Sequence, residues 1–212
     1  MEKKTQIKNV VFDMGNVLFP YQPTKYVEAM CGEKAKQDII LKEIFQAKEW
    51  FELDAGEIDL EKAWERMSAR IPKDVQEIAK TVFERWFDYI EPNEKMAELI
   101  ATLSENGYKI YLLSNTSEFF YKFKPQLDCF KYFSGVTLSY EIKMMKPNLE
   151  IYQEFFKINN LNAEECFFVD DMQENIDASR SVKMDGFVFQ NDMEALRESL
   201  KAHGVKTAKT TR

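Results

Sequence analysis

The chain has 212 residues, enough for one domain with a buried core or for a domain that carries a large insertion. Hydrophobic residues make up 45% and charged residues 31%, as in ordinary globular proteins, and no apolar stretch approaches the length of a membrane span. The formal net charge of −7 argues against binding to nucleic acid or to an anionic membrane surface. Any phosphate recognition must therefore come from a few local cations and backbone amides.

The three cysteines show no metal-ligand spacing, and their odd number argues against a disulfide framework. The first residues of the chain are not followed by an apolar signal region. Together these features predict a cytoplasmic protein. The single histidine, His203, lies in a polar segment near the end of the chain, which argues against catalysis by histidine.

Residues 9–12, Asn-Val-Val-Phe, form a β-branched and aromatic run that predicts a strand buried on both faces of a parallel sheet. The strand ends at Asp13, and Gly15 and Asn16 follow in a pattern suited to a turn with unusual backbone angles. In an open parallel sheet, ligands bind outside the carboxyl ends of the strands. Asp13 is therefore predicted to point into a ligand site.

The next 65 or so residues show helical spacing and no strand pattern. The predicted helices cover residues 24–30, residues 34–50, a segment capped by Asp59, and a segment that runs from Pro72 to Trp86. A long helical stretch between two parts of an α/β pattern indicates an inserted helical cap. We assign residues 20–90 to this cap, and residues 1–19 and 91–212 to the core.

Strands and helices alternate in the remainder of the chain, which predicts an α/β fold with a doubly wound, Rossmann-like parallel sheet. The expected strands lie at residues 108–113, 135–139, 166–169 and 187–189, and the expected helices at residues 93–105, 117–128, 147–158, 174–182 and 192–200.

Two of these later strands also end in polar residues, namely Ser114 and Asn115 in one case and Asp170 and Asp171 in the other, and Lys146 precedes a proline between them. These motifs, in this order after the Phe-Asp-Met-Gly-Asn of the first strand, resemble the haloacid dehalogenase (HAD) superfamily of phosphohydrolases with a C1-type cap. Within that superfamily, the motifs are most similar to those of α-D-glucose-1-phosphate phosphatase-like members. The resemblance runs from residue 12 to about residue 189 and implies the strand order 5-4-1-2-3.

The acidic residues in these motifs suit phosphoryl transfer. Asp13 can attack phosphorus and form an aspartyl-phosphate, which divides hydrolysis into two easier steps. Asp170 and Asp171 are expected at the same sheet edge, and three neighbouring carboxylates cannot all ionise without cations. With Lys146 the local charge is −3 plus +1, or −2. One Mg²⁺ balances that charge, and oxygen ligands are those that Mg²⁺ prefers.

The resemblance also implies metal-ligand roles. Asp171 and Asp13 would bind Mg²⁺ through their carboxylates and Gly15 through its backbone carbonyl, with Asp170 beside them or as a further ligand. Asn175, one helical turn beyond Asp171, is placed to orient that carboxylate, and a plain surface asparagine is the alternative.

The phosphate group of a substrate needs its own binding residues. The Ser114 hydroxyl and the amides of Asn115 and Thr116 are expected to hold phosphate oxygens at the start of the following helix. Lys146 is expected to pair with both Asp13 and the phosphoryl group, and to stabilise charge in the transition state.

One position departs from the phosphatases of this superfamily, which carry a second Asp as general acid and base two residues after the nucleophile. Here that position is Gly15, so the proton donor must be water or a cap residue such as Asp54 or Glu57. A missing general acid typically costs about 10²–10⁴ in rate. The sequence therefore predicts a preference for good leaving groups, such as the anomeric oxygen of a sugar 1-phosphate, or aryl and acyl phosphates.

Taken together, the motifs predict a Mg²⁺-dependent phosphatase that acts on a small phosphorylated metabolite, as a monomer or homodimer. Trp50, Phe51 and Trp64 either face the sugar or pack in the core. The first alternative is a haloacid dehalogenase, in which Asp13 attacks carbon. Gly15 suits that chemistry, because a halide leaves without a general acid. The adjacent Asp170 and Asp171 do not suit it, because a metal-free enzyme that binds an anionic substrate gains nothing from extra carboxylates. The second alternative is a binding or regulatory protein that keeps the fold without turnover.

Overall fold

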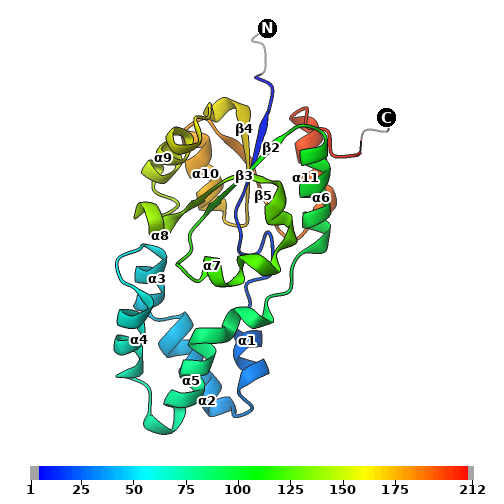
Figure 1. The fold of residues 1–212 in the computed structure, drawn as a ribbon. Coiled ribbons are helices and arrows are strands. Elements are labelled where there is room, and N and C mark those ends of the chain that lie inside the picture. The colour runs from blue at the N-terminus through cyan, green and yellow to red at the C-terminus, as the bar shows by residue number, and fades with distance from the viewer. Residues whose placement is uncertain (1–4, 210–212) are drawn as a thin grey trace.

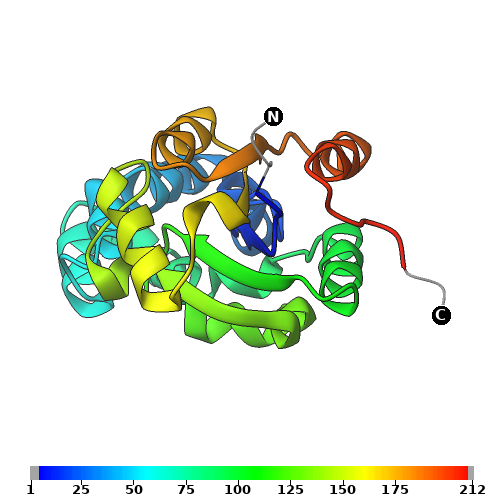
Figure 2. The ribbon, with the colours of Figure 1, turned by 90° about the horizontal axis from the view of Figure 1, so that it is seen from above.

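The computed structural model describes residues 5–209, and the ends of the predicted core, residues 1–4 and 210–212, lie outside them. A five-stranded parallel sheet in the order β3-β2-β1-β4-β5 forms its centre (Figures 1 and 2). The strand order predicted from the resemblance is therefore confirmed. The strands are β1 (Asn9–Phe12), β2 (Lys109–Ser114), β3 (Phe133–Leu138), β4 (Cys166–Asp170) and β5 (Asp185–Val188).

Helices cover both faces of the sheet, because successive residues of the central strands point to opposite sides. Val10 packs in one apolar cluster with Leu99 of α6 and Leu196 of α11, whereas Val11 packs in a second cluster with Phe155 of α9 and Ile176 of α10. This is the doubly wound arrangement that the alternating pattern predicts. The core helices are α6 (Glu94–Glu105), α9 (Leu149–Asn159), α10 (Gln173–Ser181) and α11 (Met193–Ala202).

The helices that follow β1 form a separate group at the carboxyl end of the sheet, below the strands in Figure 1. We call residues 23–89 the helical insertion. None of the helices in residues 5–209 is long and apolar enough to cross a membrane. The helical insertion contains α1 (Pro23–Met30), α2 (Lys34–Ile40), the π-helical turn η1 (Leu41–Phe45), α3 (Lys48–Asp54), α4 (Leu60–Ser68), α5 (Lys73–Arg85) and the 3₁₀ turn η2 (Trp86–Tyr89).

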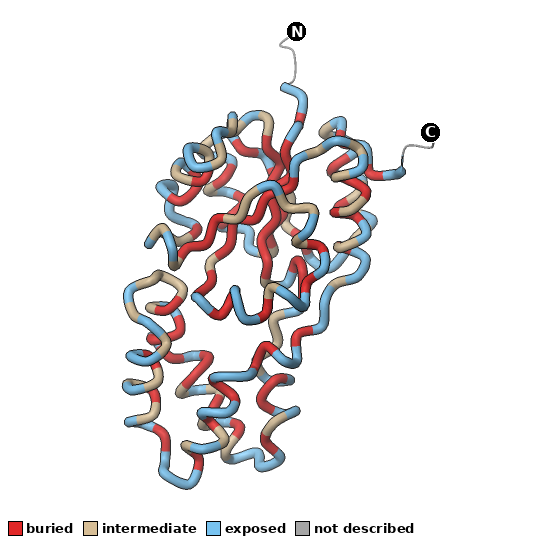
Figure 3. The backbone as a smooth tube through the Cα atoms, in the orientation of Figure 1, coloured by how far each residue is buried: buried red, intermediate tan, exposed pale blue. Residues whose placement is uncertain are grey.

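Aromatic side chains join the helical insertion to the rest of the protein. Trp86 of the insertion lies with its ring centroid 6.0 Å from that of Phe119 and 5.7 Å from that of Phe123, and Phe123 lies 5.7 Å from Phe19. All four residues belong to the apolar cluster that also contains Val10 of the sheet. Buried residues are accordingly found both in the sheet and in the insertion (Figure 3), and they belong to one apolar cluster. Burial of this continuous apolar surface stabilises the contact between the two parts.

The single helix predicted for residues 34–50 is wrong, because η1 and an extended Ala47 (ψ 150°) separate α2 from α3. The Gln46 N–H reaches back five residues to the Leu41 carbonyl at 3.1 Å, which widens the turn. The break places Phe45 and Trp50 together, with ring centroids 4.8 Å apart. The contact between these two rings is therefore formed at the expense of an unbroken α-helix over residues 34–50. The predicted cap at Asp59 is confirmed, since its side chain accepts from the Lys62 N–H at 2.8 Å.

The helix predicted for residues 117–128 is also wrong. Pro125 lacks an N–H and cannot continue an α-helix, so the segment divides into short pieces. In addition, the helix expected to open at Pro147 begins two residues later, and a short helix follows β3 where none was predicted. The short pieces of the segment are α7 (Phe120–Phe123), η3 (Lys124–Gln126) and η4 (Asp128–Tyr132). The short helix after β3 is α8 (Ser139–Ile142), and the 3₁₀ turn η5 (Ala163–Glu165) precedes β4.

Candidate active site

The carboxyl edge of the sheet brings together acidic residues from two adjacent strands. Asp13 follows β1, and its N–H donates to the Val169 carbonyl of β4 at 2.8 Å, which extends the strand pairing to the site. Asp170 is the last residue of β4, is fully buried, and is followed by Asp171. One carboxylate oxygen from each of the three residues lies within 4.8 Å of the others. The spatial cluster expected from the strand ends is therefore present.

Lys146 lies between two of these carboxylates. Its Nζ atom is 2.9 Å from Asp13 Oδ1 and 2.6 Å from Asp170 Oδ2, and the side chain is 1% exposed. Burial by itself would lower the pKa of Lys146, but the charges of Asp13 and Asp170 outweigh burial and raise it. The ammonium group is therefore retained inside the protein. The predicted pairing of Lys146 with Asp13 is present, and its second partner is Asp170.

Asn115 holds the backbone of Lys146 in place. Its side-chain Nδ2 donates to the Lys146 carbonyl at 2.9 Å, and its Oδ1 accepts from the Lys146 N–H at 2.9 Å. This two-point contact fixes the base of the lysine side chain relative to β2. Asn115, which we expected to offer its backbone amide to phosphate, thus also has a positioning role that the sequence analysis did not identify.

Burial of the carboxylates changes their proton affinity. Removal from water raises the pKa of Asp13 to about 6, and the Asp170 charge adds to this, while Lys146 opposes it. Removal from water is also the main reason that the pKa of Asp171 is raised. A divalent cation would stabilise both groups in their ionised form. The three carboxylates supply oxygen ligands at a suitable mutual distance, so the residues present fit a Mg²⁺ ion.

The two adjacent aspartates differ in how many of their hydrogen-bonding positions are filled. Asp170 Oδ2 accepts from Lys146, Asp170 Oδ1 accepts from the Met172 N–H at 2.8 Å, and the Asn175 amide donates to both oxygens at 2.9 and 3.1 Å. Asp171 Oδ2 accepts from the Asn16 amide at 2.9 Å. The prediction that Asn175 orients Asp171 is therefore wrong: Asn175 orients Asp170. The more open carboxylate is that of Asp171.

Asn16 is a site residue that the sequence analysis missed. Besides donating to Asp171, its side chain accepts from the Tyr21 N–H at 2.9 Å, so it ties the loop after β1 to the loop after β4. Its backbone is left-handed, with φ 56°, a conformation that asparagine tolerates better than most residues. The Gly-Asn pair signalled this turn, but the distant partner of the side chain has no local signature.

The expected phosphate site at Ser114 is only partly as predicted. Ser114 is buried at the end of β2, and no helix follows directly, since α7 begins at Phe120. The Thr116 N–H donates to Ser139 Oγ at 2.9 Å, so this amide is already occupied. The expectation of a helix N-terminus here, with a free amide at Thr116, is therefore wrong, whereas the Asn115 amide stays a predicted phosphate donor. A phosphate-binding role for Ser114 itself stays a prediction.

A cavity of about 270 Å³ opens above these residues, between the sheet edge and the helical insertion. Asp13, Lys146 and Asp171 line one side, and Trp50, Phe51, Asp54 and Trp86 of the insertion are among the residues on the other. Trp64, which we considered as a wall residue, is not in this lining and packs against Phe83 instead, with ring centroids 5.6 Å apart.

Unpartnered polar atoms concentrate in this cavity. In residues 5–209, four buried side-chain polar atoms lack a hydrogen-bond partner, and all four belong to residues that line it. Buried polar groups are otherwise almost always hydrogen-bonded, so such a cluster indicates the place where a ligand completes the network. The atoms are Asp13 Oδ1, which has an ion-pair contact with Lys146, Tyr21 OH, Trp86 Nε1 and Asn175 Oδ1.

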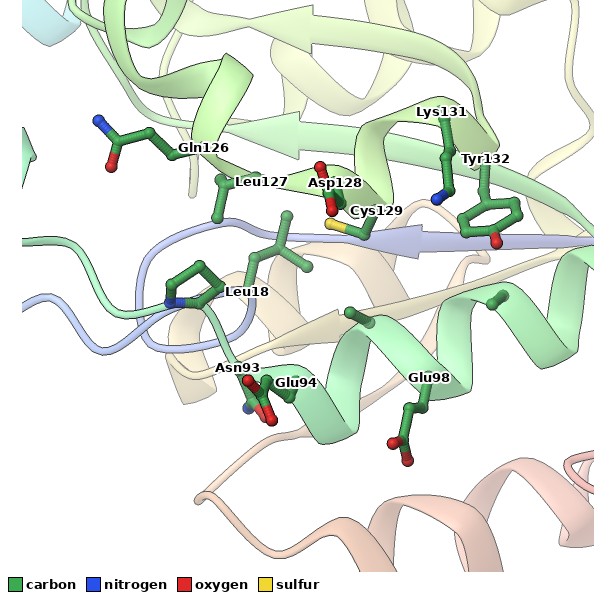
Figure 4. Close-up of a pocket in the computed structure, with 13 residues that line it drawn as sticks. Leu18, Asn93, Glu94, Glu98, Gln126, Leu127, Asp128, Cys129, Lys131 and Tyr132 are labelled. Atoms are coloured by element: carbon green, nitrogen blue, oxygen red, sulfur yellow. The ribbon is translucent and has the colours of Figure 1, made fainter.

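A second cavity, of about 390 Å³, lies between α6 and the segment of residues 126–132. Figure 4 shows Cys129 and Asp128 on one side of it and Glu94 at the start of α6 on the other, while Glu98 points away from Cys129. The acidic cluster and Lys146 do not line this cavity. Although it is larger, it lacks the convergent charges found at the sheet edge.

Comparison with known proteins agrees with this geometry. A sequence model of the family described as haloacid dehalogenase-like hydrolase matches residues 7–183. The chain is 27% identical over 195 residues to the sesquiterpene phosphatase astK of Aspergillus oryzae, covering 92% of this chain and 95% of that protein. It is 27% identical over 204 residues to the D-ribitol-5-phosphate phosphatase of Bacteroides thetaiotaomicron, covering 91% and 96%.

Among solved structures, an HAD family enzyme from Bacteroides thetaiotaomicron in complex with magnesium and inorganic phosphate superposes with a TM-score of 0.63 at 23% identity. The match covers 90% of this chain and 98% of that chain, and it shows a shared fold. The family match spans strands β1 to β4, the helical insertion and the residues of the acidic cluster. The chain belongs to the haloacid dehalogenase-like hydrolases, and its curated relatives are phosphatases.

Proposed function

We propose that this chain is a Mg²⁺-dependent phosphatase that hydrolyses a small phosphate monoester through an aspartyl-phosphate on Asp13. The observation that supports this most directly is the Lys146 ammonium, held between Asp13 and Asp170 beside the open carboxylate of Asp171. A carboxylate nucleophile and a phosphate both carry negative charge, so attack needs local cations. Lys146 supplies one of them.

The other positive charge would come from Mg²⁺. Asp13, Asp171 and the Gly15 carbonyl would hold the ion, with Asp170 as neighbour or further ligand, and the bound ion would neutralise charge on the phosphoryl oxygens. Asp13 then attacks phosphorus, Lys146 stabilises the charge that develops on the equatorial oxygens, and Asn115 keeps Lys146 in position. Asn16 and Asn175 hold the two adjacent aspartates in place.

We assign residues 20–90 to a cap that closes over the nucleophile and residues 1–19 and 91–212 to the catalytic core. Contacts of Trp50, Asp54 and Trp86 with the cavity support this division, since the cap would then select the leaving group. A cytoplasmic location fits the three unpaired cysteines, all of which are buried.

The substrate that suits the cavity best is a hydroxylated phosphate ester such as a sugar 1-phosphate. The aromatic side chains of Phe45, Trp50 and Trp86 line the cavity and offer apolar surface to a sugar ring. Within residues 5–209, Tyr21 OH and Trp86 Nε1 have no hydrogen-bond partner, and both can donate to the hydroxyl groups of such a ligand. A second candidate is a terpenyl phosphate, which matches the name of the fungal relative. Exposed Phe51 and Met172 at the cavity favour that apolar group.

Removal of the metal is expected to abolish activity. Addition of a chelator should stop phosphate release from p-nitrophenyl phosphate, and Mg²⁺ should restore it, because without the ion the site keeps a charge of −2. Mg²⁺ at a hundred times its dissociation constant should also raise the free energy of unfolding by about 2.7 kcal/mol, measured by thermal melting. Phosphate release that persists in chelator would contradict the dependence on Mg²⁺, whereas halide release from a 2-haloacid without any phosphate release would favour the dehalogenase alternative, in which Asp13 attacks carbon.

The substitution Tyr21→Phe is expected to separate the two substrate classes. It removes one donor from the cavity and leaves its shape unchanged, so KM for a sugar 1-phosphate should rise by about two- to twelvefold, the equivalent of one hydrogen bond of 0.5–1.5 kcal/mol. KM for a terpenyl phosphate should not change. Steady-state kinetics with both substrates measure this, with Tyr121→Phe, which lies outside the cavity, as the control. An equal effect on both substrates would contradict the sugar assignment.

A further inference from the structure

The position of Gly15 leaves the proposed reaction without a proton donor from the loop that follows β1. The closest side-chain atom to a Cβ built at Gly15 would be the Tyr21 Cβ at 3.8 Å, so the loop itself has room for a side chain that this sequence does not supply. Three carboxyl groups line the cavity, those of Asp13, Asp171 and Asp54. Asp13 and Asp171 are committed to the acidic cluster, which leaves Asp54 of the helical insertion.

Asp54 is the last residue of α3, and its carboxyl makes no hydrogen bond or ion pair with any other residue in the range 5–209. Removal from water, together with the Asp13 charge, raises its pKa to about 7. A carboxyl of this kind is partly protonated at neutral pH and can give up its proton readily. Tyr21, the neighbouring hydroxyl in the cavity, is a poor donor, because burial and then the Asp54 charge raise its pKa well above 10.

Contacts on the backbone fix Asp54 relative to the core. The Ser139 hydroxyl donates to the Asp54 carbonyl and accepts from the Thr116 N–H, so it links α3 to the loops that follow β2 and β3. Gly56 has φ +68°, and a Cβ there would lie 2.1 Å from the Tyr140 carbonyl oxygen, so the turn after α3 touches α8 directly. These contacts fix the end of α3 to the core, and Asp54 lines the same cavity as Asp13.

We propose that Asp54 is the general acid and base of the reaction, a role that rests on the phosphatase function proposed above. In the first step the Asp13 carboxylate bonds to phosphorus, the bond from phosphorus to the leaving oxygen breaks, and the Asp54 proton moves to that oxygen to give an alcohol. In the second step water attacks phosphorus, the bond to Asp13 breaks, and the Asp54 carboxylate takes the proton from water. The sum is ester plus water giving alcohol plus phosphate.

Glu57 is the other acid that the sequence offered for this role. It is exposed, lies beyond the turn at Gly56, and does not line the cavity. It is therefore a matched control from the same turn. The preference for good leaving groups that Gly15 predicts should become pronounced once Asp54 is replaced, since the leaving oxygen would then depart unprotonated.

The test compares the full chain with Asp54→Asn, Asp54→Glu and Glu57→Gln, all with Mg²⁺, on p-nitrophenyl phosphate and on an alkyl phosphate. A nitrophenolate is stable enough as an anion to leave without being protonated, whereas an alkoxide must be protonated as it leaves. For Asp54→Asn we expect kcat on the alkyl ester to fall by about 10²–10⁴, and on p-nitrophenyl phosphate by a much smaller factor. Asp54→Glu, which keeps an acid, should recover part of the activity on the alkyl phosphate. Glu57→Gln should show the same ratio of kcat on the alkyl phosphate to kcat on p-nitrophenyl phosphate as the unaltered protein.

Equal losses on both esters in Asp54→Asn, or no loss on either, would overturn the role of Asp54 and leave the phosphatase proposal in place. Absence of Mg²⁺-dependent activity in the unaltered protein would overturn the phosphatase proposal, and the role of Asp54 with it. Thermal melting of each variant checks its fold. If Asp54→Asn melts early, the Asp54→Glu variant decides, because an equal loss on both esters in that variant also contradicts the proposal.

Discussion

Replacement of Asp13 by Asn is expected to lower kcat by about 10⁴–10⁶, the range seen when an essential catalytic group is removed from other hydrolases. An amide has nearly the shape of the carboxylate but cannot form the phosphoenzyme. The fold should survive, because the backbone N–H of Asp13 continues to donate to Val169 and because one of the crowded negative charges is removed. Phosphate release from p-nitrophenyl phosphate, with and without chelator, measures the loss, and thermal melting measures the stability.

The matched control for this substitution is Asp177→Asn, an exposed aspartate on α10 that hydrogen-bonds to Gln173 outside the cavity. It should keep the activity of the unaltered protein. When turnover is stopped with acid, mass spectrometry should detect one added phosphoryl group on the unaltered protein and on Asp177→Asn. Asp13→Asn should carry no such group. Equal rates for Asp13→Asn and the unaltered protein would remove the case for a nucleophile and favour a binding or regulatory protein.

Much of the core could be predicted because each strand has a local signal. Buried runs such as residues 9–12 and 166–169 are too short for a helix, and a polar residue marks the end of each. Parallel strands place those ends at one edge, so Asp13, Asp170 and Asp171 could be brought together before any coordinates were known. The strand order itself came from the resemblance to a family, since alternation alone allows other orders.

The contacts inside the site could not be predicted in the same way. Asn16 meets Asp171 across 155 positions of sequence, and Asn115 meets Lys146 across 31, so neither hydrogen bond has a local signature. Helical spacing placed Asn175 one turn beyond Asp171, but spacing along a helix does not specify which of two adjacent carboxylates the side chain reaches. In the structure the buried Asp170 takes that contact.

Helix breaks in the insertion were missed for a related reason. Residues 34–50 carry apolar residues at helical spacing throughout, yet the π-helical turn η1 resets that spacing so that Phe45 and Trp50 pack together near the cavity. The same aromatic pattern made Trp50 and Trp64 equivalent candidates for the wall. Only the tertiary packing separates them, because Trp50 lines the cavity and Trp64 contacts Phe83.

Substitution of Lys146 by Met is expected to reduce both stability and activity. The side chain fits a buried site in volume, but it leaves Asp13 and Asp170 without their shared cation. Removal of one partner from a buried ion pair typically costs about 3–5 kcal/mol of unfolding free energy. Loss of a charge that stabilises the transition state should lower kcat by about 10²–10³. Chemical denaturation and steady-state kinetics measure the two effects.

Mg²⁺ should partly compensate for this substitution, since the local charge of the acidic cluster changes from −2 to −3 and the cluster attracts a divalent ion more strongly. The rise in melting temperature on adding Mg²⁺ should therefore be larger for Lys146→Met than for the unaltered protein. Lys157→Met is the control, because that exposed lysine pairs with Glu154 at the surface, where such a pair is worth about 0.3–0.5 kcal/mol. If Lys146→Met were as stable as this control without Mg²⁺, then Lys146 would not be the cation that balances the buried carboxylates.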